Sequence, residues 1–130
     1  MTTPIIGAFT GHYIMIKTTE LLAKKSHPTE TALEPASLPA YFAATPGWTQ
    51  DGARIVKTFQ FKNYYETLAF INAIAYVIHA EDHHPELVVT YNRCAIKFDT
   101  HTANGGKGGI SENDFICAAK VDAIYQQSFS

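Results

Sequence analysis

Cysteine is scarce in this chain of 130 residues, and long apolar runs are absent. Cys94 and Cys117 fall inside segments expected to be a strand and a helix, so we expect buried thiols in a reducing compartment and no disulfide framework. No apolar run reaches the roughly 18–20 residues that span a bilayer. No basic segment precedes the apolar stretch at residues 5–16, so we expect a cytoplasmic location and no secretory leader.

An excess of basic charge is also missing. Lys and Arg number 10 against 12 Asp and Glu, which gives a formal net charge of −2. Proteins that bind the phosphate backbone need clustered positive charge, so we expect no direct contact with nucleic acid. The hydrophobic fraction of 46% and the charged fraction of 17% are ordinary for a globular protein. The length suffices for one core, which predicts a single domain.

Histidine, in contrast, is concentrated in one stretch. Four of the six histidines lie between His79 and His101, and His83 and His84 are adjacent and followed by Pro85. Imidazole has an unperturbed pKa of about 6.5, which lets it exchange a proton near neutral pH. Two adjacent histidines held by a proline, with a third downstream, predict a proton-transfer site. Histidines that serve only packing are the alternative.

Two short segments after this stretch predict a tight antiparallel hairpin. Residues 87–91 and 94–98 are rich in β-branched and aromatic side chains, and the polar pair 92–93 separates them. A loop at 92–93 pairs Tyr91 with Cys94, Val89 with Ile96, Leu87 with Phe98, Glu86 with Asp99 (an unfavourable like-charge pair) and His84 with His101. Directly opposed residues have Cβ atoms about 4.5–5.5 Å apart, so the imidazoles of His84 and His101 could reach one small ligand.

Turn and capping residues predict the other elements. Ser37 is expected to N-cap a short helix to residue 44, and Asp51-Gly52 to turn a hairpin between residues 48–50 and 54–61. We expect Trp48 to be a core anchor.

Two longer helices are predicted as well. Asn63 begins a helix to about Ala80 that is apolar over much of its circumference, which indicates a subunit interface or a central position. Ser111 caps a final helix with Asp114 in its first turn. The order α-β-β-α-β-β-α predicts an α+β fold in which helices pack on one face of a four-stranded antiparallel sheet.

The N-terminal part of the chain fits this pattern least. Residues 1–34 contain several loop-forming residues, and we treat them as an N-terminal extension of unknown role that is ordered only if it docks on the body or on a partner. Residues 35–130 form the predicted single domain. The glycine-rich loop at residues 104–109 holds one lysine but lacks the spacing of a P-loop, so we interpret it as a connector.

Several segments, found in one order along the chain, carry a family resemblance. They are His79-x3-His83-His84-Pro85-x5-Tyr91-x9-His101 followed by Asp114, together with Pro46-Gly47-Trp48, Phe59-Gln60-Phe61-Lys62 and Gly109-Ile110-Ser111-Glu112-Asn113-Asp114-Phe115. This pattern, from about residue 38 to 125, resembles the pterin-4a-carbinolamine dehydratase family. Two features depart from it: the loop after His101 is several residues longer than in the shortest members, and His79 stands where many relatives have glutamate.

The resemblance implies both a reaction and an assembly. The reaction is the dehydration of 4a-hydroxytetrahydropterin to quinonoid dihydropterin and water, which recycles the pterin used by aromatic amino acid hydroxylases. Such a hydroxylase is therefore an expected partner, and a homodimer or homotetramer is the expected assembly. The pterin is the substrate, and neither a metal nor an organic cofactor is expected. General acid–base help of the kind this reaction needs is typically worth about 10²–10⁴-fold.

The resemblance also implies roles for individual residues. His83, His84 and His101 are the expected catalytic set, with His83 and His101 as the acid/base pair and His84 mainly holding the pterin. Asp82 is expected to orient a neighbouring imidazole. Asp114 is assigned a structural role at the helix start. The expected substrate-binding residues are Asp82, His83, His84, Asp99, Thr100, His101 and Thr102.

Two other functions stay open. His79 and His83 are four residues apart, a spacing that can place two zinc or copper ligands on one helix face. Pro85 limits that helix, however, and no HExxH pattern supports a metal site. Some members of the family resemble dimerisation cofactors for a transcription factor or assembly factors, and such a role would need no catalysis. The complete three-histidine set favours retained catalysis.

Overall fold

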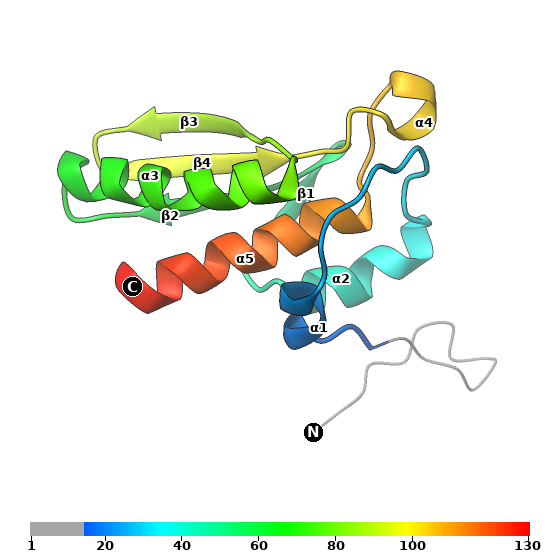
Figure 1. Ribbon diagram of the computed structural model, residues 1–130, viewed down its shortest axis with the longest axis horizontal. Coiled ribbons are helices and arrows are strands. Elements are labelled where there is room, and N and C mark those ends of the chain that lie inside the picture. The colour runs from blue at the N-terminus through cyan, green and yellow to red at the C-terminus, as the bar shows by residue number, and fades with distance from the viewer. Residues whose placement is uncertain (1–14) are drawn as a thin grey trace.

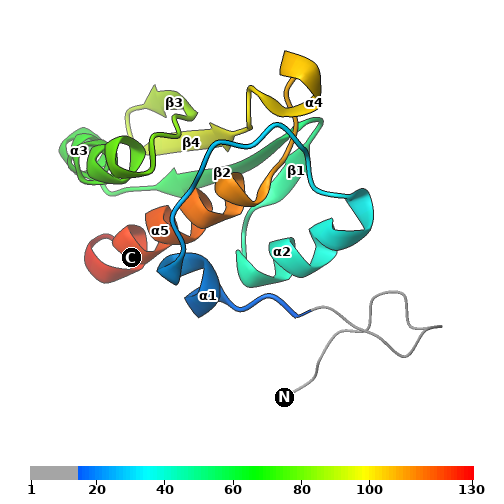
Figure 2. The same cartoon turned by 45° about the vertical axis from the view of Figure 1, so that its right-hand side comes forward.

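The computed structural model describes residues 15–130, and its centre is a four-stranded antiparallel sheet. Two long helices, α3 (Tyr64–Glu81) and α5 (Glu112–Ser128), lie across one face of the sheet (Figures 1 and 2). The predicted α+β class, with helices on one face, is confirmed. The strand order is β1-β2-β4-β3, for β1 (Thr49–Asp51), β2 (Arg54–Gln60), β3 (Glu86–Thr90) and β4 (Arg93–Phe98).

Shorter elements complete the described chain. They are α1 (Thr18–Ala23), the 3₁₀ turn η2 (Pro35–Ser37), α2 (Leu38–Ala44) and α4 (Ala103–Gly106). Ser37 precedes α2 as predicted, but its hydroxyl donates to the carbonyl of Glu34 (2.8 Å) and does not cap the helix. No described helix, short or long, is both long enough and apolar enough to cross a membrane.

The first hairpin forms at the predicted turn. Asp51 pairs with Arg54, which leaves Gly52 and Ala53 as a two-residue loop. Gly52 has φ +62°, a left-handed conformation that costs glycine little.

The second hairpin has a register that differs from the predicted one by two residues. Leu87 pairs with Ile96, so the loop is Tyr91-Asn92 and Glu86 lies opposite Lys97. The predicted pairs of Glu86 with Asp99 and of His84 with His101 across the ladder are therefore wrong. Tertiary contacts hold the loop in this place: the Tyr91 ring stacks on Tyr64, and its carbonyl accepts a hydrogen bond from Thr67 Oγ1 (3.0 Å).

The core lies between the sheet and the two long helices. Its largest fully buried side chains include Phe59 from β2, Phe70 from α3, Phe98 from β4 and Phe115 from α5. Cys94 and Cys117 are free and buried, as predicted, and burial raises the pKa of the Cys94 thiol to about 11.

Asp122 of α5 pairs with Lys57, a partly buried lysine of β2. Trp48 is buried, as predicted, and its indole N–H donates to Asp122 (3.1 Å to either oxygen). Lys57 Nζ donates to the same carboxylate at 2.9 Å. Burial raises the pKa of Asp122, against the opposing effect of Lys57 and Trp48. The lysine thus neutralises a carboxylate that would otherwise be costly to bury.

The described part of the N-terminal region packs on the body. Residues 1–14 of the predicted extension lie outside the described residues. Leu21 of α1 is fully buried in the core, and Ile16 and Leu33 pack against it. Residues 24–33, which we call the strap, run from α1 across α5 towards α4 (Figures 1 and 2).

Candidate active site

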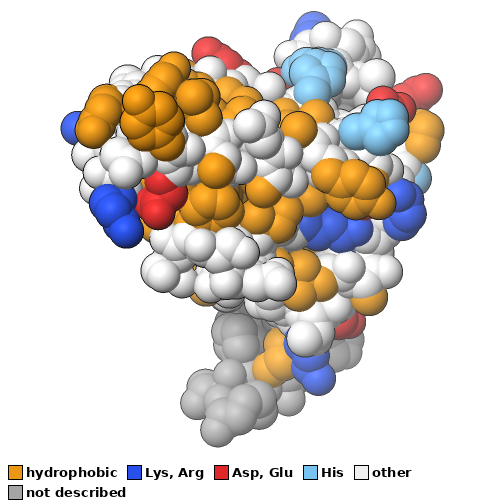
Figure 3. All heavy atoms as spheres, turned by 60° about the vertical axis from the view of Figure 1, so that its left-hand side comes forward, with side chains coloured by type: hydrophobic (Ala, Val, Ile, Leu, Met, Phe, Trp, Pro, Cys, Tyr) orange, Lys and Arg blue, Asp and Glu red, His pale blue; other side chains and the backbone are white. Residues whose placement is uncertain are grey.

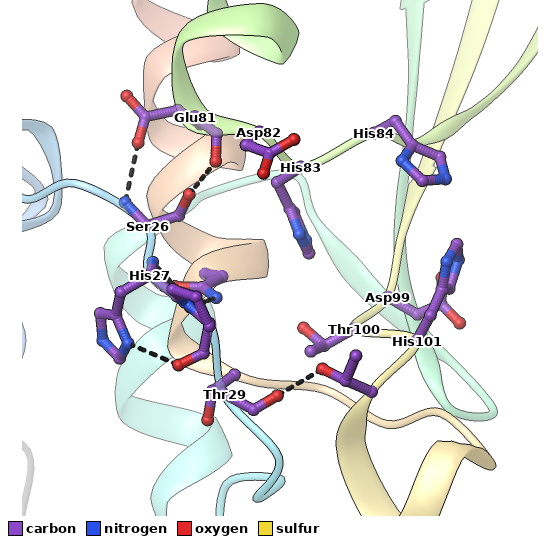
Figure 4. A pocket seen from close by; sticks show the side chains of 13 residues that line it. Ser26, His27, Thr29, Glu81, Asp82, His83, His84, Asp99, Thr100 and His101 are labelled. Carbon is purple, nitrogen blue, oxygen red and sulfur yellow. Dashed lines mark hydrogen bonds and ion pairs between the residues drawn. The ribbon is translucent and has the colours of Figure 1, made fainter.

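A cavity of about 290 Å³ opens where α3, β4 and the strap meet. This volume is near the lower end of the range of about 300–1,000 Å³ typical of small-ligand pockets. Figure 4 shows the strap on one side of the cavity and His84 and His101 on the other. The lining residues come from the strap (Ser26, His27, Pro28, Thr29), the end of α3 and the turn after it (Glu81, Asp82, His83, His84), the end of β4 (Asp99, Thr100, His101, Thr102) and α5 (Asn113).

The end of α3 delivers the two adjacent histidines to the cavity. Asp82 ends the helix in a left-handed conformation (φ +50°, ψ +46°), and the amide of His83 donates back to the carbonyl of Ile78 (3.3 Å). Pro85 then favours extended backbone at His84, which leads into β3. The reversal turns the chain from helix to strand within a few residues.

Asp114 fixes the ring of His83. The two groups are 2.6 Å apart (Nε2 to Oδ1), and the His83 side chain is only 12% exposed. Phe98 lies parallel to the imidazole, with 5.7 Å between ring centroids. A ring held at one nitrogen and across one face is pre-organised for proton exchange at its second nitrogen.

Asp114 itself is fully buried and joins three parts of the site. Its Oδ2 accepts hydrogen bonds from the Ser111 amide (2.8 Å) and from Thr100 Oγ1 (3.1 Å). The predicted cap of α5 by Ser111 is confirmed, since the hydroxyl of Ser111 accepts from the amide of Asn113. The contact between Asp114 and His83 was not predicted. One carboxylate therefore sets both the start of α5 and the orientation of a site histidine.

His84 and His101 meet at the rim of the cavity. Their ring centroids are 5.0 Å apart with the planes at 70°, so the predicted proximity is confirmed although the predicted register is wrong. His101 lies beside Asp99 (Nε2 to Oδ1, 3.1 Å), and its side chain is 58% exposed. His83 is thus largely buried, whereas solvent and a ligand can reach His84 and His101; His27 of the strap is the fourth histidine that lines the cavity.

The other expected binding residues also line the cavity, but their side chains differ in availability. Thr100 is buried, and its hydroxyl is engaged by Ser111 and Asp114. The hydroxyl of Thr102 donates to the carbonyl of Thr29 in the strap. Among the described residues, Asp82 makes no side-chain hydrogen bond to an imidazole; Asp114 and Asp99 are the carboxylates beside the rings.

The strap, Glu81 and Asn113 supply the site residues that sequence reasoning did not identify. Ser26, Thr29 and Asn113 are brought to the cavity by contacts between segments more than 50 residues apart. The segment His27-Pro28 carries only loop-forming signals, and these do not indicate where a loop docks.

Glu81 anchors the strap, and its titration predicts a loss of stability in acid. Burial disfavours its charged form, but hydrogen bonds from Lys120 and Ser26 and the charge of Lys25 outweigh burial, so the pKa of Glu81 lies below its ordinary value of 4.5. Such a carboxyl stabilises the fold above that value and loses its contribution as the pH falls through the lower folded pKa.

We therefore expect Glu81→Gln to unfold more easily than the wild-type chain at about pH 7, with the difference shrinking as the pH falls below 4.5 and through the lower folded pKa of Glu81. Urea unfolding at neutral pH and at a series of acidic pH values measures this. A stability gap that stays the same across the series would contradict the assignment.

Comparisons with known proteins give this geometry a context. The family model described as Pterin 4 alpha carbinolamine dehydratase matches residues 31–124. The chain belongs to this family. A Bdellovibrio bacteriovorus protein, provisionally named a pterin-4-alpha-carbinolamine dehydratase, is 58% identical over 116 residues, which cover 89% of this chain and 97% of that protein. The resemblance drawn from the histidine stretch is thereby confirmed.

Two further relatives span most of the dehydratase-family domain. A Nitrosospira multiformis protein with the same provisional name is 46% identical over 110 residues, covering 82% of this chain and 94% of its own. The crystal structure of a transcriptional coactivator/pterin dehydratase from Brucella melitensis is similar with a TM-score of 0.66 and 28% identity, over 72% of this chain and 98% of that one.

Proposed function

We propose that this chain dehydrates 4a-hydroxytetrahydropterin to quinonoid dihydropterin and water, with His83, His84 and His101 as the polar groups that act on the substrate. The observation that supports this most is the convergence of these three imidazoles on one small cavity, which His27 of the strap also lines; His83 and His101 lie beside carboxylates. Family membership supports the same reaction class. Recycling of the pterin for an aromatic amino acid hydroxylase is the corresponding physiological role.

The reaction needs two proton transfers, which two imidazoles can provide. One proton goes to the hydroxyl on C4a, which leaves as water, and one proton is lost from a ring nitrogen of the pterin as the C=N bond forms. We assign these steps to His83 and His101, and the holding of the ring to His84. Asp114 and Asp99 each lie beside one ring nitrogen, so they orient the rings of His83 and His101.

Recognition of the pterin's amide edge falls to the end of β4. Because the hydroxyls of Thr100 and Thr102 are already engaged, we propose that this stretch binds mainly through backbone groups and the Asp99 carboxylate. Asp82 lies exposed at the opposite end of the histidine pair and completes the polar rim.

An assay of dehydration tests the proposal directly. The wild-type chain should raise the rate at which a 4a-hydroxytetrahydropterin yields quinonoid dihydropterin well above the spontaneous rate, followed by ultraviolet absorbance. Heat-denatured protein at the same concentration is the control. A wild-type rate equal to the spontaneous one would remove the proposed reaction.

A non-catalytic role is the second candidate, because the Brucella melitensis relative is described as both a transcriptional coactivator and a pterin dehydratase. The dehydration assay separates the two, since a coactivator alone would show only the spontaneous rate. The histidine metal site gains no support from geometry: residues 15–130 contain no group of three or more His, Cys, Asp and Glu side chains placed to hold a metal. Stoichiometric zinc in elemental analysis of the purified chain would favour that reading instead.

We also propose assembly into a homodimer or homotetramer. Figure 3 shows hydrophobic side chains gathered on one part of the surface. An oligomer would bury such surface, and analytical ultracentrifugation measures its size. Among the described residues, the exposed large hydrophobic side chains other than Leu22 come from α3 and the second hairpin: Tyr64, Tyr65, Leu68, Tyr76, Val88, Val89 and Tyr91.

A further inference from the structure

The strap forms one wall of the cavity. Ser26, His27, Pro28 and Thr29 line it on the side opposite His84 and His101 (Figure 4). The histidine stretch from His79 to His101 supplies the opposite side of the cavity and none of this wall. The enclosed shape of the site therefore depends on a segment that lies more than 50 residues before the motif in sequence.

Asn113 holds the centre of the strap by two hydrogen bonds. Its Oδ1 accepts from the amide of His27 (3.1 Å), and its Nδ2 donates to the carbonyl of the same residue (2.6 Å). Asn113 is 5% exposed and lies in the first turn of α5. An amide side chain that bonds both backbone groups of one residue fixes that residue much as a neighbouring strand would.

Other anchors reach the backbone of the strap from α3 and from the segment around α4. The Ser26 amide donates to Glu81 of α3 (2.8 Å), and the Thr29 carbonyl accepts from Thr102. The Glu30 carbonyl accepts from the amide of Asn104 (3.2 Å). These contacts fix the backbone of the strap, and the strap contributes the shape of one wall of the cavity.

The residue that positions the strap is adjacent to the residue that positions a catalytic histidine. Asn113 holds His27, and Asp114 holds His83. Both belong to the first turn of α5, whose start is fixed by the Ser111 cap. This short rigid unit therefore sets the distance between the strap wall and the His83 side of the cavity.

We propose that the strap is a permanent wall of the substrate site, which confines the bicyclic pterin ring by shape against the histidines, and that Asn113 is its positioning residue. The inference rests on the proposed dehydratase function. A ligand that needs the docked strap binds more weakly in proportion to the fraction of molecules in which the strap is released. The two hydrogen bonds of the Asn113 side chain go to the backbone of His27 and not to the histidines assigned to proton transfer. Removing this side chain should therefore weaken substrate binding more than it slows the chemical step.

The variant Asn113→Ala tests this through the division between KM and kcat. We expect KM for the carbinolamine, and Kd for a stable 7,8-dihydropterin, to rise about five- to tenfold, while kcat changes less than about twofold. Asn72→Ala, which removes an exposed amide from α3, is the matched control and should change neither constant. Pro28→Gly loosens the strap without removing an anchor, and should raise Kd in the same direction by a smaller factor.

Limited trypsin digestion gives a second readout that needs no turnover. Cleavage after Lys25, identified by mass, should be faster in Asn113→Ala than in the wild-type chain, and a saturating dihydropterin should slow it in the wild type, because a ligand stabilises the state that binds it. Two outcomes would overturn the inference and leave the dehydratase function intact. One is that dihydropterin binds but does not slow cleavage at Lys25. The other is that Asn113→Ala binds dihydropterin as tightly as the wild type although its strap is cleaved faster. A wild-type chain that neither binds the dihydropterin nor accelerates dehydration would remove the proposed function, and the inference with it.

Discussion

Replacing His83 by alanine is expected to lower kcat for pterin dehydration by about 10²–10⁴-fold, the usual worth of a general acid or base. Among the site histidines, His83 has both a fully buried carboxylate partner, Asp114, and an aromatic ring, Phe98, against its face. Pre-organisation of this kind is what makes an imidazole effective in proton transfer. Steady-state kinetics with the carbinolamine, corrected for the spontaneous rate, measures the loss.

The alanine variant also leaves a buried carboxylate without its partner, so a second variant must separate chemistry from folding. The amide of glutamine in His83→Gln can donate to Asp114 but cannot exchange a proton at neutral pH. We expect it to recover most of the thermal stability and none of the activity. His79→Ala is the matched control, because His79 is exposed on α3 and does not line the cavity. A folded His83→Gln chain with wild-type kcat would show that His83 does not transfer a proton.

The secondary structure was largely predictable because its signals are local. Asp51-Gly52 identified the first hairpin, and Asn63 and Ser111 identified the starts of the two long helices. Each of these residues acts on backbone groups only a few positions away. The α+β class followed from the order of the elements.

The register of the second hairpin was not predictable from the same signals. Asn92-Arg93 is a weak turn sequence, and the observed loop is held by Tyr64 and Thr67 of α3 and by the Phe61 amide, which donates to Asn92 (2.8 Å). A shift of two residues keeps every side chain on its predicted face. This is why His84 and His101 still converge, whereas the residue opposite Glu86 is Lys97 and not the predicted Asp99.

The strap wall and the bond between His83 and Asp114 depend entirely on tertiary structure. The capping role of Asp114 is predictable, because Asp114 follows Ser111 by three residues in the sequence, and the structure confirms it. Its second role depends on how α5 packs beside the end of α3. A single sequence shows capping partners three residues apart but does not show a contact across 31 residues.

Asp114 links the stability of the fold to the geometry of the site, and its replacement by alanine should damage both. The substitution removes the acceptor of the Ser111 amide, of the Thr100 hydroxyl and of His83 Nε2 inside the protein. Each buried group left without a partner costs about 1–3 kcal/mol, so we expect the free energy of unfolding to fall by about 2–5 kcal/mol. Urea unfolding measures this, with Asp51→Asn on the exposed strand β1 as a control that should stay near wild type.

Asp114→Asn is the variant that distinguishes the two roles. Its amide keeps the shape and one acceptor oxygen, which the Ser111 amide and the Thr100 hydroxyl can still use. The amide nitrogen would then face His83 and donate to Nε2, which reverses the direction of that hydrogen bond and favours the opposite tautomer of the ring. We therefore expect a smaller loss of stability than with alanine, together with a fall in kcat of about 10²-fold or more, because the proton of the ring would lie on the wrong nitrogen for its transfer step. If Asp114→Asn kept its kcat while Asp114→Ala lost stability as expected, Asp114 would serve the fold alone, and the orientation of His83 would have to come from its packing on Phe98.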